Sequence, residues 1–385
     1  MLITEKSACT GCELCLSVCP GNAIHMQADE EGFRFPVVDD NLCTKCQLCQ
    51  KKCPANHPGG HITDTHALKA FSGFYKDENM LKKSASGGIA SALAEKVLAE
   101  GGRVFGVAYS HDFKHAEYIE ADSLDKINLL KGSKYIQARK GNLYKKIESS
   151  VKEDRPTFFI GLPCEVAAVK AFLGGDRENL LTCDLICHGP TSEKVSEQYI
   201  SRLEKSYKSK LKFFSVRYKE KGWEPMYVKA KFENGKVFLK PFFETEYGIA
   251  FRRMSRPSCA NCSFKGGNRA SDLTIGDFWG LAPADKGYNA NGVSVMIVNT
   301  PKGEELLRDI PGFSMEETDV EAAISGNPFF NASKNLKGVR GAFSKGFANK
   351  GLFSACKKYR YKERMERIPL FAGLVPFAKK VMRKR

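Results

Sequence analysis

Two copies of one cysteine pattern lie near the start of the chain, and they constrain the fold more than any other feature. The copies consist of Cys9, Cys12, Cys15 and Cys19, and of Cys43, Cys46, Cys49 and Cys53. In each copy two residues separate the first three cysteines, three residues precede the fourth, and a proline follows it. A loop with a cysteine at every third position can wrap one corner of a 4Fe-4S cluster, and the proline turns the chain away.

This spacing is typical of bacterial ferredoxins with two clusters, in which the last cysteine of each run binds the other cluster. We therefore expect one cluster on Cys9, Cys12, Cys15 and Cys53, and the other on Cys19, Cys43, Cys46 and Cys49. Paired Cys-x-x-Cys motifs also bind zinc, but zinc sites usually take four ligands from two pairs. Two uninterrupted runs of four, each closed by Cys-Pro, fit zinc poorly and favour two 4Fe-4S clusters.

The length and the cysteine content indicate what surrounds this small domain. A chain of 385 residues is too long for a ferredoxin alone and predicts two or three domains. Cluster-type cysteine spacing without an apolar N-terminal segment favours a reducing compartment, so we expect a cytoplasmic protein. No apolar run reaches the roughly 18 residues that a membrane-spanning helix needs, the longest uncharged stretch near the C-terminus being residues 368–378.

The positive charge of the chain is concentrated at its C-terminal end. The net charge is +16, and residues 334–385 contribute sixteen Lys or Arg against two acids, whereas residues 1–60 carry five basic and seven acidic residues. A basic tail can face nucleic acid, an anionic membrane, an acidic redox partner or solvent. The segment 379–385 follows the apolar residues 370–378, so peripheral contact with a membrane surface is one hypothesis. We expect no nucleic-acid binding, because no known binding motif accompanies the charge.

The hydrophobic pattern predicts an α+β fold of three parts: a two-cluster ferredoxin domain over residues 1–60, a larger domain over 65–345 and a basic tail over 346–385. Residues 23–26 and 33–38 read as a hairpin, and a turn-rich linker follows at Pro58, Gly59 and Gly60. In the larger domain, alternating strands and helices predict a mixed, partly parallel sheet with extra β-hairpins. The predicted helices cover 89–99, 142–151, 165–173 and 192–205, with a further helix from 303; the predicted strands cover 103–109, 157–160, 180–186, 212–218, 226–232, 236–240, 273–275 and 293–299.

Four later cysteines are candidates for a third 4Fe-4S site. Cys164 falls where a strand turns into a helix, a position that favours its thiolate, and Cys187 closes the next strand. If those strands are parallel neighbours, both cysteines reach the same edge of the sheet. Cys259 and Cys262 form a Cys-x-x-Cys pair that lacks two ligands. Scattered cysteines are more often buried apolar residues than ligands, so this site is weaker than the first two.

Three glycine-rich segments are candidates for a flavin site. Ser86, Gly87 and Gly88 precede a predicted helix, whose free amides could hold a phosphate, although the segment could also be a simple helix cap. Lys131, Ser133 and Lys134 offer cations and a hydroxyl for a pyrophosphate or ribose, or form an ordinary exposed turn. Gly276 and Asp277 precede Phe278 and Trp279, which suits a planar ring but equally suits a core.

Taken in order behind a dicluster ferredoxin, these segments resemble the coenzyme F-420 hydrogenase/dehydrogenase β-subunit family. The resemblance covers roughly residues 65–345 and rests on the segments at 86–88, 161–164, 187–189, 259–262 and 276–280. It implies FAD beside a 4Fe-4S cluster, and electron transfer between a two-electron carrier, such as the deazaflavin F-420, and one-electron clusters. It places the FAD phosphates on Ser86, Gly87 and Gly88, with Lys131, Ser133 and Lys134 nearby, and the third cluster on Cys164, Cys187, Cys259 and Cys262.

The sequence departs from this family at one turn, where Leu162 and Glu165 replace a common threonine and glutamine. A carboxylate beside the redox centre could change the hydride donor, which the family name therefore does not identify. We expect a cytoplasmic iron-sulfur flavoprotein that passes electrons between a hydride-carrying cofactor and a redox partner protein. The alternative is an electron-transfer subunit that has no substrate of its own and feeds a partner reductase. The sequence singles out no catalytic residue.

Overall fold

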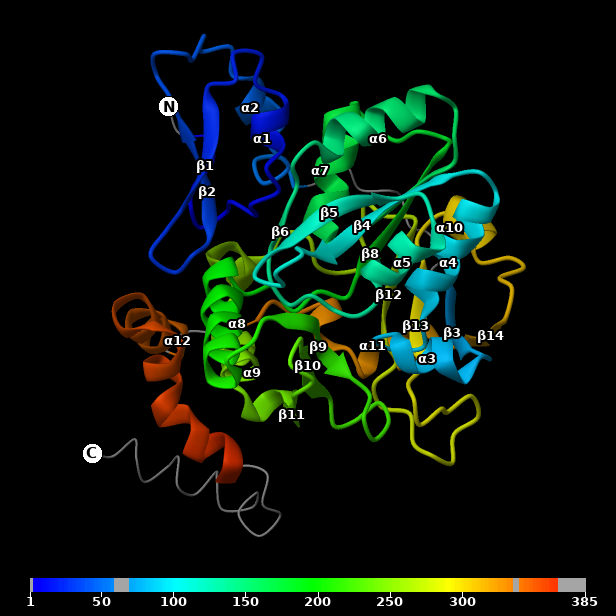
Figure 1. Ribbon diagram of the computed structural model, residues 1–385. Helices are drawn as coiled ribbons and strands as arrows, with labels where there is room; N and C mark the ends of the chain where they lie inside the picture. Colours follow the sequence, from blue (N-terminus) through cyan, green and yellow to red (C-terminus); the bar gives the residue numbers. More distant parts are fainter. Residues whose placement is uncertain (1–2, 59–68, 335–338, 366–385) are drawn as a thin grey trace.

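The computed structural model of the chain describes residues 3–58, 69–334 and 339–365. A small N-terminal domain lies against a larger body built on a nine-stranded sheet (Figure 1). Most of the predicted linker, at Gly59 and Gly60, lies outside the described residues, as do the apolar segment 370–378 and the basic residues 379–385. The α+β class with a partly parallel sheet is confirmed.

The small domain contains one antiparallel hairpin and two short helices. Its two four-residue helices begin within the cysteine runs, each directly after a residue with left-handed backbone geometry. Glu13 and Gln47, which are 34 residues apart, both have φ 61° and ψ 10°, so the sequence repeat is also a structural repeat. The elements are α1 (Leu14–Ser17), β1 (Ile24–Ala28), β2 (Arg34–Val38) and α2 (Leu48–Lys51).

The large sheet is mixed, in the order β14-β3-β13-β12-β8-β7-β4-β5-β6. Strands β4, β7, β8 and β12 pair in parallel, whereas β13, β3 and β14 extend the sheet antiparallel at one side, and β5 pairs antiparallel with β4. The strands are β3 (Lys69–Tyr75), β4 (Arg103–Tyr109), β5 (Ala116–Ala121), β6 (Ala138–Arg139), β7 (Thr157–Gly161), β8 (Leu180–Leu185), β12 (Leu273–Asp277), β13 (Ser294–Val298) and β14 (Phe313–Thr318).

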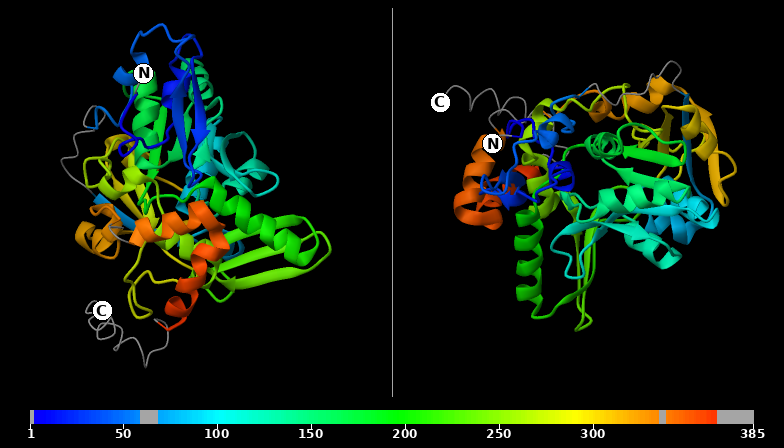
Figure 2. Two further views of the ribbon diagram at one scale, coloured as in Figure 1. Left: turned by 90° about the vertical axis from the view of Figure 1, so that its left-hand side faces the viewer. Right: turned by 90° about the horizontal axis from the view of Figure 1, so that it is seen from above.

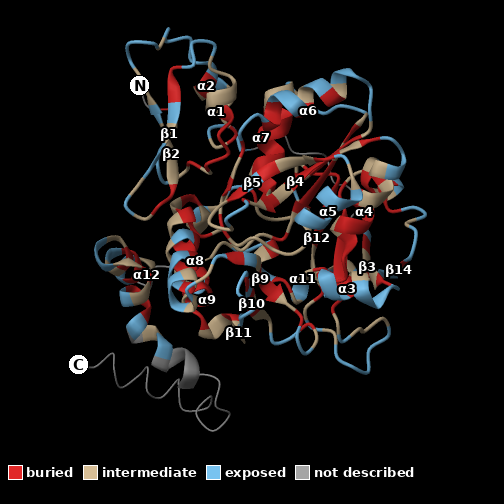
Figure 3. Ribbon diagram, viewed as in Figure 1, coloured by how far each residue is buried: buried red, intermediate tan, exposed pale blue. Residues whose placement is uncertain are grey.

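Helices cover both faces of this sheet because successive strand residues point to opposite sides. Val104 and Phe158 pack with α4, α5 and α10 on one face, while Phe105 and Phe159 pack with α6 and α7 on the other. Figure 3 shows the resulting buried layer in the strands and in α7. The helices of this body are α3 (Glu78–Lys83), α4 (Ile89–Ala99), α5 (Leu124–Leu130), α6 (Leu143–Lys152), α7 (Pro163–Leu173), α10 (Pro301–Leu306) and α11 (Val320–Ser325).

A second, three-stranded sheet projects from this body together with helix α8 (Figure 2). Its antiparallel order is β11-β10-β9, and a turn at Asn234 and Gly235 joins β10 to β11. Helices α8, α9 and α12 pack together beside it. The elements are α8 (Glu193–Tyr207), β9 (Leu211–Tyr218), β10 (Tyr227–Phe232), β11 (Val237–Pro241), α9 (Glu246–Arg253) and α12 (Val339–Met365).

The C-terminal segment begins as part of the core. Helix α12 runs across the expected boundary at residue 346, bends at Gly351, and buries Phe343, Phe347, Leu352 and Cys356. These apolar side chains pack with α8 and α9 in the largest hydrophobic cluster. The expectation of a separate basic tail from residue 346 is therefore wrong for residues up to 356, because the apolar face of this helix outweighs its charge in deciding where it packs.

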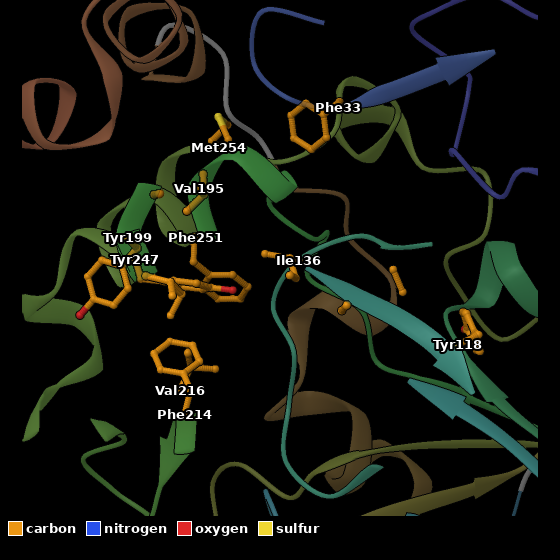
Figure 4. Packing of buried hydrophobic residues seen from close by; sticks show 14 of the residues in the cluster. Phe33, Tyr118, Ile136, Val195, Tyr199, Phe214, Val216, Tyr247, Phe251 and Met254 are labelled. Atoms are coloured by element: carbon orange, nitrogen blue, oxygen red, sulfur yellow. The ribbon is translucent and has the colours of Figure 1, made fainter. Parts of the chain in front are cut away.

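The same hydrophobic cluster joins the small domain to the body. Phe33, in the loop before β2, is completely buried and belongs to one cluster with Ile136, Val195 and Met254 (Figure 4). The ferredoxin domain is therefore docked through an apolar contact and is not an appendage on a linker. Among the described residues, no helix is long and apolar enough to cross a membrane.

Candidate functional site

The eight cysteines of the N-terminal domain are gathered into two crossed sets. Each set lines its own small apolar cavity and combines three cysteines of one run with the last cysteine of the other. We call them the inner site, with Cys9, Cys12, Cys15 and Cys53, and the outer site, with Cys19, Cys43, Cys46 and Cys49. This is the arrangement that two 4Fe-4S clusters require.

The two sets do not form sites for single ions. Among the described residues, no group of three or more His, Cys, Asp or Glu side chains is arranged to hold one metal ion. A cubane differs in this respect, because its four thiolates bind four different iron atoms and stand farther apart than the ligands of one ion.

The inner site is more buried than the outer site, although Cys49 of the outer site is also buried. Cys9 and Cys12 are 7% and 8% exposed, whereas Cys46 is exposed in a solvent-facing loop. Burial raises the pKa of the Cys12 thiol to about 11. A thiolate at this depth needs nearby positive charge, which cluster iron supplies on binding.

The other four predicted ligands also converge, and we call them the third cysteine set. Cys164 lies in the first turn of α7, directly after β7, and Cys187 lies two residues after β8, which is the parallel neighbour of β7. Cys259 lies within a short 3-10 helix, Pro257–Asn261, and Cys262 directly follows that helix. Cys262, Cys187 and Cys259 all contribute to the raised pKa of the Cys164 thiol, so the four cysteines lie near one another.

Burial outweighs the helix N-terminus at Cys164. Burial, followed by the neighbouring carboxylate of Glu165, raises the pKa of the Cys164 thiol well above its ordinary value. The expectation that the helix position would favour the thiolate is therefore wrong for the chain without iron. As at Cys12, a bound cation would be needed to hold this sulfur as a thiolate.

A buried ion pair links the third cysteine set to the inner site. Lys140 Nζ lies 2.6 Å from Glu165 Oε1, and its backbone N–H donates to Glu13 Oε2 at 3.1 Å. Glu165 Oε2 also accepts from the Tyr118 hydroxyl at 2.6 Å and from the Leu162 N–H at 2.9 Å. Both carboxylate oxygens of Glu165 therefore have partners, and through Lys140 they link the segment of Cys164 to that of Cys12. Nothing in the sequence marks Lys140 or Tyr118 for this role.

The glycine-rich segment at 86–88 lies in a tight place before α4. A Cβ on Gly87 would lie 2.1 Å from Gly73 O, and a Cβ on Gly88 would lie 2.4 Å from the Tyr75 ring, so packing alone requires both glycines. Ser86 donates its hydroxyl to Val293 O at 2.7 Å. Helix α4 is 11 residues long and has no side-chain cap, which leaves its first amides for another acceptor.

A buried lysine that the sequence did not single out reaches this segment. Lys219 is 8% exposed, and its ammonium donates to Ser86 O at 2.7 Å and to Leu81 O at 2.8 Å. No ion pair between Lys219 and a carboxylate is present in the described part of the chain. Burial, and then the charge of Arg217, lower the pKa of Lys219 to about 7. A buried cation without an acidic partner beside a helix N-terminus is suited to an anionic ligand.

The predicted cations at Lys131 and Lys134 have partners inside the chain. Lys131 Nζ lies 3.3 Å from Glu95 Oε1 in α4, and 3.6 Å from Met80 Sδ. Lys134 donates to the backbone carbonyl oxygens of residues 129, 130 and 131 at the end of α5, and burial lowers its pKa to about 7. Ser133 lies beside the Tyr135 hydroxyl. Lys131 therefore lies close to α3, as does Lys219. Lys134 instead caps the C-terminal end of α5.

Gly276 and Asp277 end strand β12 beside the third cysteine set. A Cβ on Gly276 would lie 2.8 Å from the Ile186 side chain, next to Cys187, so the two strands approach closely there. Asp277 accepts two hydrogen bonds from Arg217, at 2.6 and 3.0 Å, and one from Trp223 Nε1 at 3.2 Å. Sequence reasoning named Asp277 but missed Arg217, because a buried arginine resembles a surface arginine in a sequence.

Two aromatic rings lie between the glycine-rich segment at 86–88 and Asp277, which adjoins the third cysteine set. Trp223 and Trp279, the two tryptophans of the chain, stack with centroids 4.5 Å apart and an angle of 5° between their planes. A Cβ on Gly292 would lie 3.1 Å from Trp223 and 3.3 Å from the backbone of Ser86. The tryptophan pair therefore adjoins the glycine-rich segment on one side and Asp277 on the other.

His188 completes the edge of this region. Its ring lies 4.2 Å from Phe329 between centroids, and burial, with the charges of Lys334 and Lys265, lowers its pKa to about 4, so the imidazole is neutral. Lys265 donates to the Cys187 carbonyl oxygen. The neutral imidazole thus adjoins the third cysteine set without adding charge to it.

Two separate parts of the chain match known protein families. Residues 8–57 match the family model of the 4Fe-4S dicluster domain, and residues 154–320 match that of the C terminus of the coenzyme F420 hydrogenase/dehydrogenase beta subunit. Among solved structures, a chain from a xenon-derivatised F420-reducing [NiFe] hydrogenase complex of Methanosarcina barkeri is 18% identical, with a TM-score of 0.45, and the match covers 80% of this chain and 96% of that one. No curated protein matches the chain.

The fold and the crossed cysteine sets define an iron-sulfur protein with a dicluster 4Fe-4S domain and a role in electron transfer. Within the larger domain, residues 154–320 match the C-terminal domain of the coenzyme F420 hydrogenase/dehydrogenase beta subunit. The chain is therefore a redox protein in which a two-cluster ferredoxin is fused to such a domain.

Proposed function

We propose that this chain is an FAD- and iron-sulfur-dependent oxidoreductase that passes electrons between a hydride-carrying cofactor and a redox partner protein. FAD, when bound, exchanges two electrons with a hydride carrier and single electrons with clusters. The observation that carries the proposal is the buried Lys219 ammonium at the uncapped start of α4, which has no carboxylate partner among the residues that the structure describes.

The residues of the body offer both halves of a flavin site. The amides of Gly87 and Gly88 and the ammonium of Lys219 would hold phosphate groups, with Ser86 and Lys131 beside them. The tryptophan pair and the Arg217–Asp277 ion pair lie between this end and the third cysteine set, where an isoalloxazine ring would be close to a cluster. Gly292 lies against both Trp223 and Ser86, Trp223 donates to Asp277, and Gly276, which precedes Asp277, lies against Ile186.

The third cysteine set would hold a third 4Fe-4S cluster on Cys164, Cys187, Cys259 and Cys262. Support comes from the convergence of the four thiols at the carboxyl ends of β7 and β8, which is where open α/β sheets bind ligands. The order of sites across the molecule is then the flavin region, the third cysteine set, the inner site and the outer site.

The exposed outer site favours exchange of electrons with another protein. Leu42 and Leu48 are 54% and 40% exposed beside Cys46, and Val37 is 36% exposed nearby. Exposed apolar side chains of this size around a redox centre are suited to a protein surface. This observation also favours the alternative function, an electron-transfer subunit that feeds a reductase. Turnover of F420, NADH or NADPH by the isolated protein would distinguish the two.

The first test is the cofactor content of the protein purified and reconstituted without oxygen. We expect about twelve irons and one FAD per chain, and about eight irons with flavin retained in Cys259→Ala. A protein with eight irons and no flavin would overturn the proposal. A Cys259→Ala variant that keeps about twelve irons would overturn only the third cluster.

The second part of the test uses the pH dependence of FAD binding. Since the pKa of Lys219 is lowered to about 7, its ammonium loses its proton as the pH rises, and FAD affinity should fall by about tenfold between about pH 6 and pH 9. Lys219→Gln should bind FAD about tenfold more weakly at pH 6 and show no such dependence. Lys134→Gln is the matched control, because the half-buried Lys134 also has its pKa lowered to about 7 but caps α5. Equal losses in both variants would contradict phosphate binding by Lys219.

A further inference from the structure

Arg256 is a fully buried cation at the inner site. The residue is 1% exposed, and its guanidinium donates from Nε to Cys9 O at 2.6 Å and from one terminal nitrogen to Cys9 Sγ at 3.3 Å. The remaining donors bond Arg34 O at 2.8 Å and Gln137 Oε1 at 2.7 Å, and the group stacks over Phe35 at 4.1 Å. None of these partners is a carboxylate, so no acidic side chain among them balances the charge.

The body supplies this cation to the ferredoxin domain from across the interface. Arg256 lies three residues before Cys259 in the sequence, and its backbone carbonyl accepts the Cys259 N–H at 3.0 Å. Cys43, the counterpart of Cys9 in the second run, has no such contact with a cationic side chain in the described part of the chain. The two equivalent cysteines therefore differ in whether a buried cation bonds them.

We propose that Arg256 is the counter-charge of the cluster at the inner site and selectively raises the reduction potential of that cluster. On reduction the cluster takes up one electron from the reductant, no bond breaks, and the guanidinium keeps its proton. A reduced cluster is more negative than an oxidised one, so a cation bonded to its ligand sulfur stabilises the reduced form more. Burial acts in the opposite direction, because it removes the water that would otherwise solvate the added charge.

The inference depends on the dicluster domain and not on the flavin or the third cluster. It gives the inner site a defined task, which is to accept electrons despite being buried between the body and the outer site. At the outer site, exposed charges such as Lys51 are screened by water and salt and have a smaller effect on the cluster there. If the protein contained no flavin, the effect of Arg256 on the inner cluster would still be expected.

The test requires a background in which the inner cluster can be observed without the outer one. In the full-length chain, Cys43→Ala/Cys46→Ala removes two ligands of the outer cluster and leaves the inner cluster. Cys9→Ala/Cys12→Ala provides the reverse background. The reduction of each cluster is then followed in a potentiometric titration by its electron paramagnetic resonance signal, with dithionite as reductant.

In the first background, Arg256→Gln and Arg256→Met should lower the reduction equilibrium constant of the inner cluster at least tenfold, or 59 mV for one electron. Arg256→Lys keeps the positive charge, so its inner cluster should have a reduction potential close to that of the chain with Arg256. Arg256→Gln in the second background should change the outer cluster less than threefold. Unchanged inner potentials, or equal shifts at both clusters, would overturn the proposal.

A matched control separates charge from positioning. Gln137 donates to Thr10 O and Gly11 O at 2.9 Å and so holds the same loop without a charge. Gln137→Leu should therefore disturb the loop but shift the inner potential less than threefold. A shift as large as that of Arg256→Gln would assign the effect to loop geometry and overturn the electrostatic role.

If Arg256→Gln and Arg256→Met fail to hold the inner cluster, a measurement on the chain with Arg256 intact still tests the proposal. With 15N-labelled arginine, the reduced inner cluster in the first background should show hyperfine coupling to an arginine nitrogen, because Arg256 bonds Cys9 Sγ. The reduced outer cluster in the second background should show none. Absence of coupling at the inner cluster would overturn the proposal without any substitution at Arg256.

Discussion

The two cysteine runs have the same spacing and the same local backbone, yet they occupy opposite environments. In the first run, residues from Cys9 to Leu14 are mostly buried beneath Arg256, Gln137, Tyr144 and Lys140 of the body. In the second run, the residues from 44 to 48 are all exposed. A repeated motif can therefore form a repeated local structure while its two copies serve as an internal and an external contact.

The residues at equivalent positions of the two runs make this difference concrete. Glu13 and Gln47 share one backbone conformation, but Glu13 bonds Arg34 and the Lys140 amide, whereas Gln47 is exposed. Leu14 is 1% exposed and Leu48 is 40% exposed. The copies thus share the geometry that holds a cluster and differ in what lies outside it.

The largest expected effect is the loss of the buried ion pair behind the first run. Lys140→Ala leaves the Glu165 carboxylate buried without its partner and should destabilise the protein by about 3–5 kcal/mol. Lys52, beside the second run, donates to Ala171 O and forms no ion pair with a carboxylate in the described part of the chain, so Lys52→Ala should cost less than about 1.5 kcal/mol. Anaerobic urea unfolding followed by circular dichroism measures both.

A double variant checks the cause of that loss. Lys140→Ala/Glu165→Gln no longer contains a buried unpaired carboxylate and should recover part of the stability. Equal stability of Lys140→Ala and Lys52→Ala would contradict the contrast between the two runs. So would a double variant less stable than Lys140→Ala alone.

The next largest effect is the difference in stability loss when the leucines at equivalent positions of the two runs are truncated. Leu14→Ala opens a cavity in the core that joins the two domains and should cost about 2–5 kcal/mol. Leu48→Ala should change the stability by less than about 0.5 kcal/mol, because its side chain is solvated. The same urea unfolding experiment applies, and similar losses for the two variants would show that the second run is also covered.

The smallest effect concerns the access of solvent to the two clusters. In the presence of an iron chelator, the outer cluster should release its iron about tenfold or more faster than the inner cluster, because release from the inner site requires local opening of the interface. Absorbance of the chelated iron measures the two phases. Cys43→Ala/Cys46→Ala should abolish the fast phase, and its persistence there would assign that phase to another site.

Local pattern predicted much of the fold. The range expected for the strand at 103–109 and for the helix at 89–99 agrees with β4 and α4, because alternating apolar residues and alanine-rich helical periodicity are local signals. Strands β3 and β14 were missed. They pair with each other, and β14 exposes charged residues such as Glu316 and Glu317, so its pairing depends on a partner some 240 residues away.

The residues of the candidate site also fall into those that the sequence predicted and those that only the fold revealed. The cysteines and Asp277 carry a chemical signature in the sequence, whereas Lys140, Arg217, Lys219 and Arg256 do not. Lysine and arginine are most often solvated, and only their burial next to a carboxylate, a helix start or a cysteine sulfur gives them a role. Lys134 is the opposite case, since its sequence context suggested a ligand contact and the fold uses it as a helix cap.

The sequence by itself determined the ligand spacing, the crossed assignment of the two cysteine runs and the alternation of strands and helices, because each depends on residues close together in the chain or on a fixed motif. The tertiary structure alone decided which run is buried, how the third cysteine set meets and where Arg256 lies. These depend on contacts between residues up to 247 positions apart, whose side chains are placed by burial and charge in the complete fold.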